Sequence, residues 1–311
     1  MIAQARVRRE GRVHPHPRRG MFLLPSLFTA GTMALGYYSI TQTIAALSGS
    51  AQTHLDWAAI AILIAIPFDA LDGRIARMTN TASAFGKELD SLADVIAFGA
   101  APSLLSFAWG FHFLPLSVNP HLREHLLQAG AFICFLFLLG GASRLARFNI
   151  SQDAQPRNPG RPGHKYFVGM PIPAGAGLLA ATVHFFYGIP VFSWWISLPW
   201  LVLVGLCAFL MVSTWRFWSA KEINLSRRHP FQLLVLLALV AYIMLRYSNV
   251  MLFLAALVYM FSGIWARTAY SWSRRRRRRA AEAEPPVESE LEPEMGDEPH
   301  SLAHHGSFDL R

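Results

Sequence analysis

Residues 55–111 read LDWAAIAILIAIPFDALDGRIARMTNTASAFGKELDSLADVIAFGAAPSLLSFAWGF. Two apolar runs, 55–71 and 87–111, flank a polar connection in this stretch. An α-helix needs about 17–25 residues to cross the roughly 30 Å hydrocarbon core of a bilayer, and both runs have that length. The stretch therefore predicts two neighbouring transmembrane helices joined by a polar turn.

The same apolar pattern extends over most of the chain. Of its 311 residues, 53% are hydrophobic and only 15% are charged, and the mean hydropathy is +0.31. This composition excludes an ordinary water-soluble domain. Because a membrane-spanning segment must satisfy its own backbone hydrogen bonds, we predict an all-α polytopic membrane helix bundle. Its eight predicted transmembrane helices are 22–47, 55–71, 87–111, 125–147, 168–188, 191–214, 230–246 and 249–271.

The basic residues predict how these spans are oriented. With eight spans, every Lys and Arg except Arg123 and Arg246 falls on one side, which the positive-inside rule identifies as cytoplasmic. We therefore expect a multi-pass protein of the cell (inner) membrane with both termini in the cytoplasm. The net charge of +9 is concentrated beside the spans, which predicts contact with anionic membrane lipids and not with nucleic acid.

Three regions follow from this pattern. Residues 1–20 form a basic cytoplasmic arm, and residues 21–272 form the transmembrane domain. Residues 273–311 begin with a polybasic run and continue as an acidic, proline-containing tail, a composition typical of disorder. Small residues at 140–142 and 175–177 are suited to helix packing, which leaves a homodimer open.

Four aspartates lie within a short part of the transmembrane domain. Asp69 and Asp72 are three residues apart at the end of one span, and Asp90 and Asp94 are four apart at the start of the next. Each pair therefore places its carboxylates on one helix face. Two such faces packed together make an all-oxygen pocket, which suits a hard cation such as Mg²⁺ or Mn²⁺.

The residues between these acids point to a ligand that carries phosphate. Gly73 and Ala76 lie on the helix side that carries Asp69 and Asp72, and they have almost no side chain. Gly86 clears space one turn before Asp90, while the guanidinium of Arg77 can neutralise a phosphate. A metal pocket, a cleared surface and a guanidinium together predict a diphosphate site.

These positions resemble the signature of the CDP-alcohol phosphatidyltransferase family. The match covers each fixed position of Asp69-x-x-Asp72-Gly73-x-x-Ala76-Arg77, eight further residues and Gly86-x-x-x-Asp90-x-x-x-Asp94. The resemblance implies an integral membrane enzyme that moves a phosphatidyl group from a CDP-linked lipid to an alcohol and releases CMP. It implies that Asp69, Asp72 and Asp90 bind one or two divalent cations. Asp94 would share a metal and act as general base, with CDP-lipid contacts from Asp69, Gly73, Ala76, Arg77 and Gly86.

Three further stretches are similar to the membrane-bound bacterial phosphatidylserine synthases. They are residues 68–74 together with 88–94, residues 144–149 (RLARFN), and residues 167–173 (FVGMPIP). This resemblance implies CDP-diacylglycerol and L-serine as the substrates. Serine carries a carboxylate, so we expect a cation near Asp94, and the candidates are Arg144 and Arg147 with Asn149 as a polar partner. In the first span, Ser26 and Thr32 replace the asparagines that the family pattern leads us to expect.

Two alternatives remain at this point. The same chemistry can act on another alcohol, such as choline, glycerol 3-phosphate or inositol phosphate, and the charge of the arginines does not separate serine from a phosphorylated alcohol. A divalent-cation transporter is a different class, which would use the aspartates for permeation. Against it, all four acids are predicted near one membrane face, with no acidic relay leading to the other.

Overall fold

The computed structural model describes residues 23–79, 84–150, 166–218 and 246–283. The predicted arm at 1–20, all but the last residue of the predicted seventh span at 230–246, and the tail after residue 283 lie outside them. The chain divides into two compact units, Met1–Ala269 and Tyr270–Arg311. The elements described below belong to the first unit, and the last helix, α9 (Ser248–Ala283), continues into the second.

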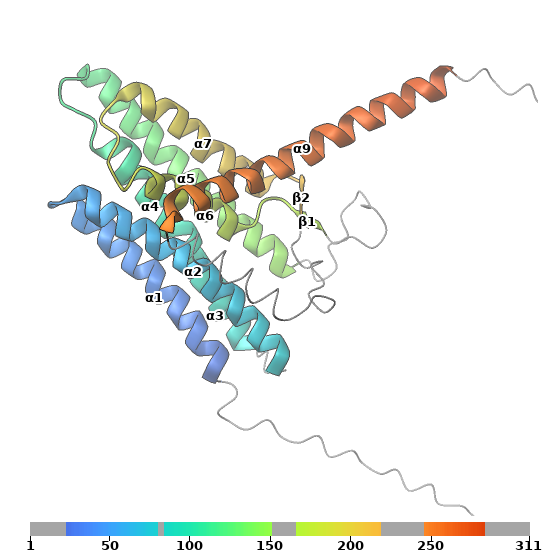
Figure 1. Cartoon of the computed structure of the whole chain (residues 1–311), viewed down its shortest axis with the longest axis horizontal. Helices are drawn as coiled ribbons and strands as arrows, with labels where there is room; N and C mark the ends of the chain where they lie inside the picture. Colours follow the sequence, from blue (N-terminus) through green and yellow to red (C-terminus); the bar gives the residue numbers. More distant parts are fainter. Residues whose placement is uncertain (1–22, 80–83, 151–165, 219–245, 284–311) are drawn as a thin grey trace, which may run out of the picture. The chain divides into compact units, whose positions relative to one another are not determined.

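The first two helices form a hairpin. Helix α1 (Leu23–Ala46) is followed after a short turn by α2 (Ala51–Thr79), and the two lie side by side (Figure 1). Ser48, Gly49 and Ser50 in the connection are residues that favour turns. Helix α1 covers residues 23–46 of the predicted span 22–47, and α2 contains the predicted span 55–71 and extends two turns beyond its end. This extension carries Asp72 and Gly73.

The next long helical segment contains two widened turns. It consists of α3 (Ala84–Asp94), the π-helical η2 (Val95–Ala100), α4 (Ala101–Phe107) and the π-helical η3 (Ala108–His112). A helix was predicted here, whereas the π-turns were not. Pro102 has no N–H to donate, and its ring would collide with a carbonyl in the preceding turn of a regular helix. A wider turn immediately before Pro102 accommodates that ring.

Helix α6 (Ile172–Phe185) lies inside the bundle. Its residues 175–184 are all buried, which is the position expected for a helix that is apolar on every side. The predicted full span 168–188 is wrong in its extent, because the 14 residues of α6 rise only about 21 Å. Gly169 adopts a positive φ of 76°, and it diverts the chain before Pro171 and the helix start.

Helices α5 (Pro120–Ile150) and α7 (Trp194–Val212) pack against each other (Figure 1). A Cβ atom at Gly140 would lie 3.1 Å from the carbonyl oxygen of Ala208, and one at Gly141 would lie 2.6 Å from Ile172. One at Gly175 would lie 2.2 Å from Met211. The small residues considered for a dimer interface therefore pack within this chain.

A short ladder that was not predicted joins the loops after α5 and α7. Strand β1 (Tyr166–Val168) pairs antiparallel with β2 (Arg216–Trp218). Phe217 of β2 is fully buried and contacts α9, where a Cβ atom at Gly263 would lie 2.2 Å from its ring. The ladder thus packs against the part of α9 that belongs to the first unit.

A polar contact joins the end of α6 to the starts of α2 and α9. His184 of α6 contacts Asp56 of α2 through Nδ1 (2.7 Å) and Ser248 of α9 through Nε2 (3.0 Å). Such contacts satisfy polar groups that would otherwise be costly inside an apolar bundle. Helix α9 therefore contacts the rest of the first unit at Ser248, through His184, and at Gly263, through Phe217.

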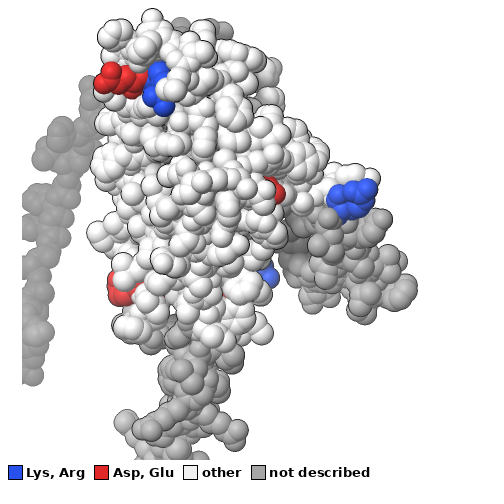
Figure 2. All heavy atoms as spheres, turned by 90° about the vertical axis from the view of Figure 1, so that its left-hand side faces the viewer, with Lys and Arg blue, Asp and Glu red and all other residues white. Residues whose placement is uncertain are grey.

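Within the described ranges, five helical segments are long and apolar enough to cross a membrane. They are Ala51–Ile75, Phe85–His112, Pro120–Ile150, Trp194–Val212 and Ser248–Trp265. Figure 2 shows a face on which most of the described surface is uncharged, with only small separate groups of acidic and basic side chains. These features are those of a multi-pass, α-helical membrane protein, whereas the number of eight spans stays a prediction.

Candidate active site

Three of the four predicted aspartates meet between α2 and α3. Carboxylate oxygens of Asp69, Asp90 and Asp94 lie within 4.8 Å of one another. Asp69 lies near the end of α2, and the other two lie one turn apart on α3. This acid cluster consists of oxygen ligands from two helices, so it can hold a divalent cation.

The fourth aspartate, Asp72, lies beside the cluster and has a different partner. It is only 4% exposed, and the hydroxyl of Thr29 on α1 donates to its Oδ2 atom. Its Oδ1 atom is buried and has no hydrogen-bond partner among the described residues. Asp72 is close enough to Asp69 and Asp90 for their negative charges to repel. A cation placed among them would relieve this repulsion.

Thr29 was not predicted as a site residue. In retrospect its signal is a row of hydroxyls on α1, where the buried polar residues are Thr29, Thr32, Ser39 and Thr43. A polar side chain inside an apolar span needs a partner. The sequence shows this row, but only the packing of α1 on α2 identifies Asp72 as the partner of Thr29.

The surface beside the acids is open at Gly73. A Cβ atom there would meet no heavy atom within 4 Å among the described residues. Gly86, on α3, is half-buried. Ala76 and Arg77 belong to α2, but their side chains lie outside the described part of the chain. The space predicted for a ligand is therefore present at Gly73, while the contacts of Arg77 stay a prediction.

Apolar side chains border the same site. Leu71 lies between Asp69 and Asp72, and Leu92 lies between Asp90 and Asp94; both leucines are exposed. Phe68, one residue before Asp69, is also exposed. Exposed apolar groups beside half-buried and buried acids provide a boundary at which the head of a lipid can reach the acids while its chains stay in hydrocarbon.

Comparison with known proteins identifies the family. Residues 22–199, more than half of the chain, match the family model described as CDP-alcohol phosphatidyltransferase. The chain belongs to this family. The matched region contains the acid cluster, Asp72 and Gly73, so the resemblance seen in the sequence is confirmed.

Several similar members of the CDP-alcohol phosphatidyltransferase family carry a specific name. A CDP-diacylglycerol–serine O-phosphatidyltransferase of Helicobacter pylori is 37% identical over 232 residues, which cover 72% of this chain and 84% of that protein. The protein of the same name in Saccharomyces cerevisiae is 35% identical, over 48% of this chain and 49% of its own length. An archaetidylserine synthase of Methanothermobacter thermautotrophicus is 36% identical, over 53% and 57%.

The three residues predicted for the acceptor occupy different positions at the end of α5. Arg144 is close enough to Asp94 for their charges to attract. Arg147 instead donates from Nη2 to the carbonyl oxygen of Val212 at the end of α7 (3.2 Å). Asn149 donates from Nδ2 to Ser91 Oγ (2.9 Å), beside Asp90. Of the two arginines, Arg144 is therefore the one that interacts electrostatically with the acid cluster.

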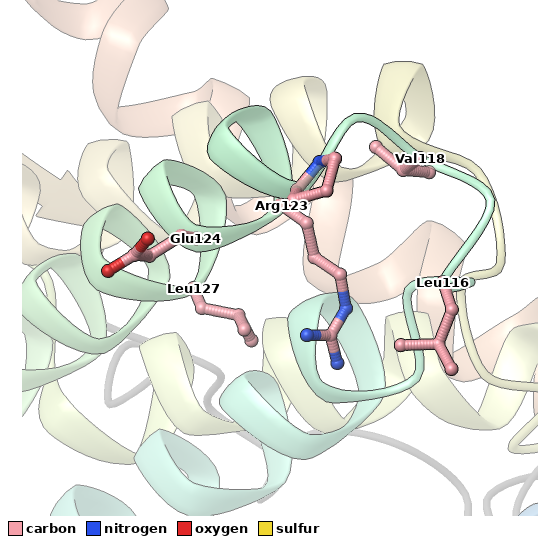
Figure 3. Close-up of a pocket in the computed structure, with 6 residues that line it drawn as sticks. Leu116, Val118, Arg123, Glu124 and Leu127 are labelled. Atoms are coloured by element: carbon pink, nitrogen blue, oxygen red, sulfur yellow. The ribbon is translucent and has the colours of Figure 1, made fainter.

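A separate hollow of about 290 Å³ lies beyond η3, more than four helical turns from Asp94. Figure 3 shows Arg123 extending between Leu116 and Leu127, with Glu124 turned away. Arg123 donates from Nε to the carbonyl oxygen of Leu114 (3.2 Å). The hollow contains none of the predicted site residues, so it does not change the assignment of the acid cluster.

Proposed function

We propose that this protein transfers the phosphatidyl group of CDP-diacylglycerol to the hydroxyl of L-serine, forming phosphatidylserine and releasing CMP. The observation that carries the proposal is the acid cluster of Asp69, Asp90 and Asp94 in a family member whose relatives are named for serine. Those relatives come from a bacterium, a yeast and an archaeon, and serine is common to their names.

We assign metal binding to Asp69, Asp72, Asp90 and Asp94. Their donor atoms are all oxygens, and Asp72 has a buried oxygen without a partner among the described residues, so they fit Mg²⁺ or Mn²⁺. When bound, such a cation neutralises the diphosphate and stabilises the departing CMP. Asp69, Gly73, Ala76, Arg77 and Gly86 would contact the CDP-lipid.

Asp94 would act as the base in a single displacement. The serine oxygen forms a bond to the phosphorus of the phosphatidyl group, the bond from this phosphorus to CMP breaks, and the hydroxyl proton passes to the Asp94 carboxylate. Two features support this role for Asp94: its buried Oδ1 has no partner among the described residues, and the cation Arg144 lies nearby.

We also propose that the reaction occurs at the cytoplasmic face of the cell (inner) membrane. The support is the excess of basic residues on the side of the membrane predicted to contain the ends of α2 and α5. Anionic lipids would contact these basic residues. In this arrangement both termini are cytoplasmic, and a homodimer would need a surface other than the glycines already packed within the chain.

The direct test is CMP release from purified protein in detergent with CDP-diacylglycerol, Mg²⁺ or Mn²⁺, and one alcohol at a time. The alcohols are L-serine, choline, glycerol 3-phosphate and inositol phosphate. We expect release only with serine, and a chelator should abolish it until metal is restored. Metal-dependent CMP release with another alcohol would support the metal-assisted mechanism but contradict serine as the acceptor. Metal-independent release would contradict the mechanism.

A further inference from the structure

Arg144 has an unusual position for a basic residue near a membrane surface. Its side chain is half-buried, and its Nε atom is buried without a hydrogen-bond partner among the described residues. A guanidinium has five N–H donors in a rigid plane, and a buried donor without an acceptor is costly. The position therefore suits a ligand that supplies acceptor oxygens.

A second polar group reaches the same place from α9. Tyr259 is half-buried, and it is close enough to Arg144 for an electrostatic interaction between the two side chains. Its ring stacks on Phe217, with the ring centroids 5.8 Å apart and the planes at 24°. The β1–β2 ladder and α9 thus hold the phenol beside the guanidinium.

Three helical elements therefore each contribute one polar side chain to the same group. Asp94 comes from α3, Arg144 from α5 and Tyr259 from α9, and Arg144 interacts electrostatically with both of the others. Arg147, one turn further along α5, already donates to the Val212 carbonyl. Arg144 and Tyr259 are two adjacent donors beside the proposed base, which is the arrangement that a carboxylate requires.

We propose that Arg144 and Tyr259 bind the carboxylate of the acceptor amino acid and so hold its hydroxyl against Asp94. The proposal rests on the proposed function and adds the residues that would select an amino acid over a simple alcohol. A site built to hydrogen-bond a polar group discriminates strongly against an analogue that lacks it, because its own donors are then left unpaired.

The test compares L-serine with serinol, which has the same amino group and a hydroxyl but a CH₂OH group in place of the carboxylate. The variants are Tyr259→Phe, which keeps the ring that stacks on Phe217, and Arg144→Lys, which keeps the charge but not the planar fork. We expect each variant to raise KM for serine by roughly ten- to a hundred-fold, the loss expected for a hydrogen bond to a charged group. The loss with serinol should be much smaller than the loss with serine in each variant, because serinol makes no carboxylate contact, and the KM for CDP-diacylglycerol should change little for the same reason.

The matched control is Tyr247→Phe, which removes the same hydroxyl from an exposed ring just before α9. It should leave both acceptors unaffected. Equal losses with serine and serinol in the Tyr259 and Arg144 variants would overturn the proposal and indicate a structural role. If the wild-type protein releases CMP with another alcohol but not with serine, the proposed function itself fails, and that result is visible before any variant is compared.

Discussion

Asp94 differs from the other acids of the site in its surroundings. It is the last residue of α3, so the backbone widens into η2 immediately after it, and its charge is balanced in part by Arg144. Its buried Oδ1 has no partner among the described residues, and a carboxylate oxygen with a free lone pair can accept a proton. This combination supports the proposal that Asp94 is the base.

Replacing the proposed base gives the first prediction. Asp94→Asn should lower kcat about 10²- to 10⁴-fold, the usual contribution of general base catalysis, while largely sparing CDP-lipid binding. CMP release and binding of CDP-diacylglycerol by calorimetry measure the two effects. Glu88→Gln, an exposed acid on the same helix, is the control and should keep full activity. An equal loss of binding would mean that Asp94 serves mainly as a metal ligand.

Thr29 leads to a second prediction at the same scale. Thr29→Val keeps the shape of the side chain but removes the donor to Asp72, so the carboxylate loses its orientation. Partners behind a metal ligand typically contribute about 10- to 100-fold in metal affinity. We expect Mg²⁺ or Mn²⁺ titrations of CMP release to shift to higher concentration by that factor. Thr41→Val removes an exposed hydroxyl from the same helix and should cause no shift.

Among the helices, the contact between α1 and η2 has the closest connection to the site. A Cβ atom at Gly36 would lie 2.6 Å from the Cα atom of Ala97, so the two backbones approach as closely as they can. Because η2 follows Asp94 directly, a displacement of η2 would be transmitted to the acid cluster. This packing therefore connects a glycine in the first helix to the geometry of the site.

We predict that Gly36→Ala lowers both stability and activity. Forcing an extra methyl group against the η2 backbone should cost about 1–3 kcal/mol of unfolding free energy, which thermal unfolding in detergent can detect. CMP release should fall in parallel because Asp94 moves. Gly49→Ala is the matched control, since a Cβ atom there meets nothing within 4 Å among the described residues. An unchanged melting temperature and unchanged activity in Gly36→Ala would contradict the idea that the packing of α1 on η2 affects the acid cluster.

Features that depend on residues close together in the sequence could be predicted, whereas features that depend on contacts between distant residues could not. The spacing of Asp90 and Asp94 is local, so helical periodicity was enough to place them on one face of α3, and their meeting with Asp69 was expected from the packing of two neighbouring spans. The pairing of Thr29 with Asp72 joins positions 43 residues apart. Tyr259 interacts electrostatically with Arg144, more than 100 positions earlier in the chain, and its ring stacks on Phe217 of another element. Apolar composition located α6 but not its length, because Gly169 and Pro171 end the preceding extended segment by backbone geometry.

For the whole molecule, orientation in the membrane can be tested with the chain's own chemistry. Both cysteines, Cys134 and Cys207, are buried, so a maleimide that cannot cross membranes should label the native protein weakly. Met78 at the end of α2 and Leu116 beyond η3 are both highly exposed, at 87% and 85%. They lie near opposite ends of the membrane-crossing helices.

We predict that Leu116→Cys is labelled in intact cells, whereas Met78→Cys is labelled only after permeabilisation. The physical reason is the placement of the basic residues around Met78 on the cytoplasmic side. Labelling is read by a mass shift on a gel. The opposite pattern would place the acid cluster on the outer face, and labelling of both in intact cells would contradict a membrane-spanning Phe85–His112 segment.

Leu71 and Leu92, exposed beside the acids, imply a particular kind of kinetics. If the donor enters sideways from the lipid past these leucines, the protein responds to how crowded the donor is within the surface, not to how much is present per volume of solution. Adding inert detergent at a fixed amount of donor would then slow turnover by dilution in two dimensions. Serine arrives from water, so the rate would saturate with its bulk concentration. The rate would therefore depend on the surface concentration of one substrate and on the bulk concentration of the other.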